Sequence, residues 1–84
     1  MNTTMRQAAQ MWQGLGLRLS DDPNYNDCPS DVANVLCTVL MQLGGEAPVA
    51  VVLHALQRDG YPDAPDRILD ALVDEPANFR WYSV

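Results

Sequence analysis

The stretch SDVANVLCTVLMQLGG, residues 30–45, decides the fold class that the sequence predicts. Apolar side chains would cover nearly every side of a helix formed here, and neighbouring elements must bury such a helix on most sides. Ser30 is a natural N-cap, and Gly44-Gly45 is the usual signal for a helix C-terminus. We therefore expect a central, buried helix over residues 30–43. Its polar residues form one narrow stripe: Asp31, Asn34, Thr38 and Gln42.

Three further helices are expected around this central one. Residues 5–19 carry apolar side chains at three- and four-residue spacing, with Asn2 or Thr3 as the cap and an end near Gly14. Residues 48–59 have proline in the first turn and glycine just past the end, although the run from 48 to 53 also fits a buried strand. Residues 63–75 begin with a capping aspartate and end before Pro76.

The last residues, 78–84, predict a short extended segment that is rich in aromatic side chains. Because neighbouring side chains of an extended chain point to opposite faces, Phe79 and Trp81 would dock on the core while Arg80 and Tyr82 point outward. We expect one all-α domain over residues 1–84, a compact bundle of about four helices with this segment at its end. The expected core is Met5, Trp12, Leu15, Val32, Leu36, Val39, Leu40, Leu43, Val49, Val52, Leu53, Leu56, Ile68, Leu69 and Leu72.

The charge of the chain narrows the classes of partner. Eleven acidic residues face five arginines, there is no lysine, and the formal net charge is −6. Such a chain repels phosphate backbones, so we expect no direct binding to nucleic acid. No apolar run approaches the ~20 residues that span a bilayer, and the first residues lack the order of a secretory signal. We expect a cytoplasmic protein with no membrane contact.

No motif points to catalysis or to a cofactor. Residues 22–33 place oxygen side chains at the first, third and fifth positions of a calcium loop, but Asp27 stands where glycine is needed and Ala33 where a bidentate glutamate is needed. His54 has no nucleophile or carboxylate near it in sequence, and Cys37 lies in an apolar helical pattern. We expect no enzyme activity, no metal site and no cofactor.

The candidate binding residues fall into three groups; the alternative is an ordinary solvated surface for the two acidic groups and a clip over the small core for the C-terminal one. Four aspartates would share one face of the last helix, with Arg67 off that row, so the row would be largely unneutralised. The loop before the central helix is also acidic, and the C-terminal segment carries the residue types enriched at binding hot spots. These residues are Asp63, Asp66, Asp70 and Asp74; Asp21, Asp22, Tyr25 and Asp27; and Arg80 and Tyr82.

Together these features favour a non-catalytic protein–protein interaction module. The expected form is a small acidic inhibitor or adaptor that binds a basic surface of a protein complex, such as a nucleic-acid-binding one. In size and charge the chain is similar to small phage-encoded anti-defence inhibitors, although no motif supports the likeness. An alternative is a winged-helix-like regulatory module, which the order of the last two helices and the aromatic segment suggests. A homodimer formed through that segment also stays open.

Overall fold

The computed structural model describes residues 4–20, 31–74 and 77–84, and it shows a mixed α/β domain. The prediction of an all-α helical bundle is therefore wrong, because a three-stranded antiparallel sheet is present. In the described ranges the chain forms, in order, α1 (Met5–Met11), β1 (Leu15–Leu19), α2 (Asp31–Gln42), β2 (Glu46–Pro48), α3 (Val49–Arg58), α4 (Ala64–Asp74) and β3 (Phe79–Ser83).

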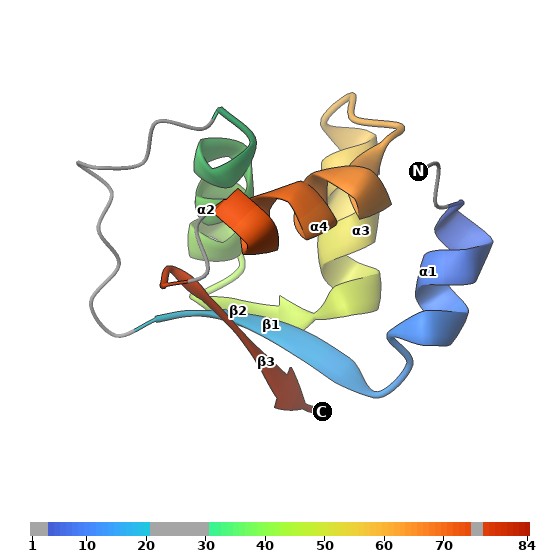
Figure 1. Ribbon diagram of the computed structural model, residues 1–84, viewed down its shortest axis with the longest axis horizontal. Coiled ribbons are helices and arrows are strands. Elements are labelled where there is room, and N and C mark those ends of the chain that lie inside the picture. The colour runs from blue at the N-terminus through green and yellow to red at the C-terminus, as the bar shows by residue number, and fades with distance from the viewer. Residues whose placement is uncertain (1–3, 21–30, 75–76) are drawn as a thin grey trace.

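The sheet has the strand order β2-β1-β3, so the first strand of the chain lies at its centre. Figure 1 shows α2, α3 and α4 on one side of this sheet and α1 beside them, so the fold has a helical layer over a sheet layer. The other side of the sheet has no described helix over it. The core therefore lies between the sheet and the helices.

β1 begins just past the predicted helix end near Gly14, on residues whose spacing continued the helical stripe. Leu15 and Leu19 are four residues apart, a spacing that puts two side chains on one face of either a helix or a strand. Leu17 separates the two cases, because it would lie off the helical stripe but shares a strand face with Leu15 and Leu19. Leu17 is fully buried, opposite Ala47 of β2. The alternation over residues 15–19 is thus that of a half-buried strand.

α1 is correspondingly short and ends before Trp12. Thr4 begins it with a capping box: its hydroxyl accepts a hydrogen bond from the Gln7 backbone N–H at 3.1 Å, and the Gln7 side chain accepts from the Thr4 N–H at 2.9 Å. These bonds satisfy backbone donors that the first turn of a helix leaves unpaired. The predicted caps, Asn2 and Thr3, lie outside the described residues.

The central helix is confirmed as α2, and its end follows from the two glycines. Gly44 donates to the Met41 carbonyl at 3.1 Å and Gly45 to the Leu40 carbonyl at 2.8 Å, which is the Schellman arrangement. Gly44 takes φ +91°, a value that costs glycine little and other residues more. The predicted cap Ser30 lies outside the described residues.

Residues 48–53, which fitted either a helix or a strand, begin at the junction of a strand and a helix. Glu46–Pro48 is β2, which the sequence analysis missed, and Val49–Arg58 is helical, so the preference for helix is confirmed for residues 49–53. Proline directly before a helix suits this junction, because it lacks the N–H that the first turn cannot pair. The edge of a sheet and the start of a helix therefore meet without a loop.

α4 and the extended C-terminal segment agree with the sequence, and most of the predicted core is buried. Five residues of that core are only partly buried: Met5, Leu15, Leu43, Leu69 and Leu72. The structure does not describe the burial of Val32. Within the described residues no helix is long and apolar enough to cross a membrane. The residues of the hydrophobic core that the predicted core did not include are Ala8, Leu17, Cys37, Ala47, Ala55, Ala64, Ala71 and Phe79.

Candidate functional site

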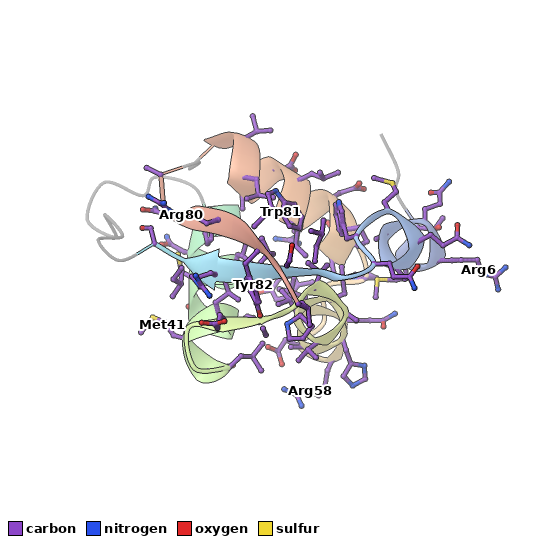
Figure 2. All side chains as sticks on the ribbon, turned by 90° about the horizontal axis from the view of Figure 1, so that it is seen from below. Arg6, Met41, Arg58, Arg80, Trp81 and Tyr82 are labelled. Carbon is purple, nitrogen blue, oxygen red and sulfur yellow. The ribbon has the colours of Figure 1, made fainter. Side chains whose placement is uncertain are left out.

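The side of the sheet that faces away from the helices carries the most distinctive group of side chains. Antiparallel pairing places Gly16 opposite Tyr82 and Arg18 opposite Arg80, while Arg18 also lies opposite Glu46 of β2. Partners directly across a ladder share one face. Figure 2 looks onto the sheet from this side, with Arg80 and Tyr82 on β3. We call Gly16, Arg18, Glu46, Pro48, Arg80 and Tyr82 the outer sheet face.

Arg18 connects the three strands of the outer sheet face. Its Nη2 lies 3.2 Å from Glu46 Oε2, and its guanidinium carbon lies 4.9 Å from the centroid of the Tyr82 ring. These contacts offset the unfavourable placement of two arginines directly across neighbouring strands. Arg80 has no described ion pair or hydrogen bond from its side chain and is exposed. The result is an arginine available for contact beside an aromatic ring.

The Tyr82 ring covers Gly16, which explains why that glycine is buried on an otherwise open face. A Cβ atom built on Gly16 would overlap the ring of Tyr82. Glycine in a strand often marks such a close approach, here by a side chain rather than by backbone. The ring is therefore held at a defined place between Arg18 and Gly16.

Among residues 4–20, 31–74 and 77–84, nothing pairs with the outer backbone edge of β3. The Ser20 N–H donates to the Asn78 carbonyl at 2.9 Å and the Val84 N–H donates to the Gly14 carbonyl at 2.9 Å. Hydrogen-bonded pairs alternate along an antiparallel ladder, so these bonds place the backbone groups of Arg80 and Tyr82 toward β1. The N–H and C=O groups of residues 79, 81 and 83 then point away from the sheet. Among the described elements, only β1 runs alongside β3.

Trp81 lies at this edge on the helix side of the sheet. Its ring centroid is 5.5 Å from that of Trp12, at an interplanar angle of 45°. Trp12 is buried, but Trp81 is 39% exposed, so the prediction that Trp81 docks on the core is only half right. Phe79 is buried as predicted, while Arg80 and Tyr82 lie on the opposite face, also as predicted.

One aspartate of the predicted acidic row is paired with an arginine. Asp63 lies in the turn before α4, where its Oδ1 accepts a hydrogen bond from Arg67 Nε at 3.0 Å. The expectation that Arg67 leaves the row unneutralised is therefore wrong at Asp63. Asp70 is exposed, and Asp66 is partly buried. Asp74 is the last residue of α4.

The Arg67 hydrogen bond holds the pKa of Asp63 below its ordinary value of 3.8, against the opposing effect of burial. A depressed pKa contributes stability that is present above the unfolded-state pKa and is lost as the pH falls through the folded-state pKa. In Asp63→Asn this contribution is absent at every pH. We expect the difference in unfolding temperature between wild type and Asp63→Asn to shrink as the pH is lowered from about 6 to about 2. Thermal unfolding followed by circular dichroism measures it, and a constant difference would contradict the role of the ion pair.

The other predicted positions contribute nothing to a described site. Asp21, Asp22, Tyr25 and Asp27, together with most of the calcium-like loop, lie outside the described residues. His54 is exposed on α3, and Cys37 is buried on α2. In residues 4–20, 31–74 and 77–84, no group of three or more histidine, cysteine, aspartate or glutamate side chains is placed to hold a metal ion.

A shallow cavity of about 320 Å³ lies between α2 and the turn after α3. Asn34, Thr38 and Asp59 supply its polar wall, and Tyr61 supplies an aromatic one. The Thr38 hydroxyl donates to the Asn34 carbonyl at 2.9 Å, and the Tyr61 ring lies 4.4 Å from the Arg67 guanidinium carbon. The Thr38 hydroxyl and the Tyr61 ring are thus already engaged in contacts within the chain.

Sequence reasoning found Arg80 and Tyr82 but missed Arg18, Glu46 and Gly16. The signal for β1 was available, because LGLRL alternates strictly between leucine and a second residue. Nothing in the sequence indicated that β1 would lie between β2 and β3, so no pattern joined Arg18 to Tyr82.

Comparisons with models of protein families, with curated proteins and with solved structures find no significant match to this chain.

Proposed function

We propose that this chain is a non-catalytic protein-binding domain of the cytoplasm, and that it contacts its partner through the outer edge of β3 and the outer sheet face. The observation that carries the proposal is the open edge of β3, where Arg80, Trp81 and Tyr82 are consecutive. Arginine, tryptophan and tyrosine are the residues most enriched at interface hot spots. An open edge also offers main-chain hydrogen bonds to an incoming strand.

Two further properties support binding rather than chemistry. The described histidine and cysteine lie on different helices, one exposed and one buried, which is not the arrangement of an activated nucleophile. The outer sheet face instead combines a placed aromatic ring with an arginine that has no described partner. A guanidinium of this kind can bind a carboxylate with two parallel hydrogen bonds.

A second candidate function is that of an acidic inhibitor or adaptor, which would bind a basic surface such as that of a nucleic-acid-binding protein. It is favoured by the net charge of −6 and by the exposed position of Asp70 on α4. Charge complementarity of this kind accelerates association and selects partners more than it adds affinity. Asp63 pairs with Arg67, and the other positions of the predicted acidic row are Asp66, Asp70 and Asp74.

One capture experiment separates the two candidates. Tagged wild type, Arg80→Ala/Tyr82→Ala and Asp66→Asn/Asp70→Asn are each used to capture proteins from the native host, with quantitative mass spectrometry as the readout. If β3 is the binding surface, the first variant loses the specific partner at least about tenfold, a change of about 1.4 kcal/mol, while the second retains it. The reverse result supports the acidic candidate. Equal capture by all three would contradict both.

A further inference from the structure

We propose that β3 pairs with β3 of a second copy of this chain, antiparallel and with the two-fold axis at Trp81, so that two sheets join into one. This inference rests on the proposed function, because it names the occupant of the same edge. It would give a six-stranded sheet in the order β2-β1-β3-β3-β1-β2. The proposal depends on three observations. The outer edge of β3 lacks most common protections, its outward backbone groups allow a defined register, and Trp81 is partly exposed.

In the part of the chain that the structure describes, the edge lacks most of the usual protections against strand pairing. Natural sheets protect their edges with charged side chains, lysine above all, with proline, bulges or inward-pointing charges, or with a covering helix or loop. β3 contains no proline or lysine, its pairing with β1 runs without a bulge from residue 79 to residue 83, and its one charge, Arg80, points to the outer face. Of the described elements, only β1 runs alongside it. An edge of this kind is a ready template for another strand.

The direction of the backbone groups limits the possible registers. Only residues 79, 81 and 83 have outward N–H and C=O groups, so these residues must form the hydrogen-bonded pairs of a new ladder. With the axis at Trp81, residue 81 pairs with its own copy and residue 79 pairs with residue 83. This register uses all three outward residues of both strands.

The same register places complementary side chains opposite each other. Arg80 of one copy lies directly across from Tyr82 of the other, where a cation–π contact can form as it does between Arg18 and Tyr82 within the chain. A shift in one direction would put Arg80 opposite Arg80, which is unfavourable. A shift in the other would put Tyr82 opposite Tyr82 and leave Arg80 without its aromatic partner. The strand is therefore complementary to itself in one register, as a two-fold interface requires.

Trp81 supplies the apolar part of the contact. It is 39% exposed and lies on the side of the sheet where it already packs on Trp12. At the two-fold axis the two copies of Trp81 would cover each other, and aromatic pairs across strands stabilise sheets. Because a single strand pair buries less than a standard interface, we expect a dimer that dissociates at low concentration.

Sedimentation velocity on the full chain tests the dimer. Between about 5 µM and about 500 µM, the expected result is a rise from the 9.3 kDa mass of one chain toward twice that mass. Ser83→Pro removes an outward N–H without touching the ladder to β1, and it should weaken the dimer at least about tenfold. Ser83→Ala is the matched control and should change the dissociation constant by less than about twofold. Thermal unfolding checks that both variants fold.

A pair of charge variants tests the register. Arg80→Glu removes the cation opposite Tyr82 and should weaken the dimer, while its carboxylate can pair with Arg18 within the chain, so the fold is kept. Arg80→Glu/Tyr82→Arg places opposite charges across the same pair and should restore the dimer. In either shifted register the double variant would face like charges and would not be restored, which overturns the proposed register.

The outcomes distinguish this inference from the function on which it rests. A chain that stays monomeric over the whole concentration range overturns the dimer, as does a dimer that Ser83→Pro leaves unchanged. If the chain is monomeric and the Arg80→Ala/Tyr82→Ala variant still loses a captured protein, the edge binds a different partner and the proposed function stands. If the dimer forms and no capture depends on β3, the edge serves self-association alone.

Discussion

Replacing Leu40 by alanine is expected to lower the free energy of unfolding by about 2–5 kcal/mol. Leu40 is fully buried on α2, the helix that packs on both α3 and α4. Truncation there removes apolar contacts and leaves a cavity that the two flanking helices can fill only in part. A domain of 84 residues has a total stability of roughly 4–13 kcal/mol, so this one change removes a large share of it.

Urea denaturation followed by circular dichroism measures the effect of Leu40→Ala. Val73→Ala is the matched control, because it also shortens an apolar side chain on a helix but at a position that is 78% exposed. The control should stay within about 0.5 kcal/mol of wild type. A loss for Leu40→Ala no larger than that of the control would contradict a central, buried α2.

Leu17→Ala is expected to have an effect of similar size, about 2–5 kcal/mol. Leu17 is fully buried at the middle of β1, with Ala47 on one neighbouring strand and Trp81 on the other. The loss would therefore weaken the packing of the sheet against the helices. This substitution also tests the strand, because a continuation of the helical spacing past Gly14 would place Leu17 off the buried stripe and make the change nearly neutral.

The measurement is again urea denaturation, with Val84→Ala as control. Val84 follows β3 and is 69% exposed, so shortening it should change the free energy of unfolding by less than about 0.5 kcal/mol. If Leu17→Ala and Val84→Ala behaved alike, the central position of β1 would be wrong.

Local patterns predicted the elements whose signal is contained in their own residues. α2 was found because nearly all its sides are apolar, and its end was found because Gly44 and Gly45 suit a left-handed backbone. The same reasoning placed α3 before Gly60, where the Gly60 N–H donates to Gln57 and the Tyr61 N–H donates to Leu56. α4 and the extended segment 79–83 were also correctly assigned.

The sheet was missed because its evidence is spread along the chain. β1 follows α1 closely, and the spacing of Leu15 and Leu19 continues the helical stripe that ends at Trp12. β2 is only three residues long and directly precedes a helix, which is too short for periodicity to show. An extended C-terminal segment was expected, but a single strand without a predicted neighbour cannot indicate a sheet.

The candidate site likewise contains residues that local patterns could predict and residues that only the tertiary structure brings together. Arg80 and Tyr82 were placed on the outward face because alternation along one strand follows from local geometry. Arg18, Glu46 and Gly16 could not be added, because their nearness to Tyr82 depends on the order β2-β1-β3. The acidic row was inferred from helical spacing alone, which did not show that the turn before α4 brings Arg67 against Asp63.

By itself, then, the sequence determined that a central helix ends at Gly44 and Gly45, and that the last aromatic residues alternate between two faces. These properties depend on residues that are neighbours in the chain. Only the tertiary structure decided that β1 lies between two strands from far along the chain, and that an open edge with Arg80 and Tyr82 results. Pairing between distant strands is set by how the whole core packs, and no local pattern contains that information.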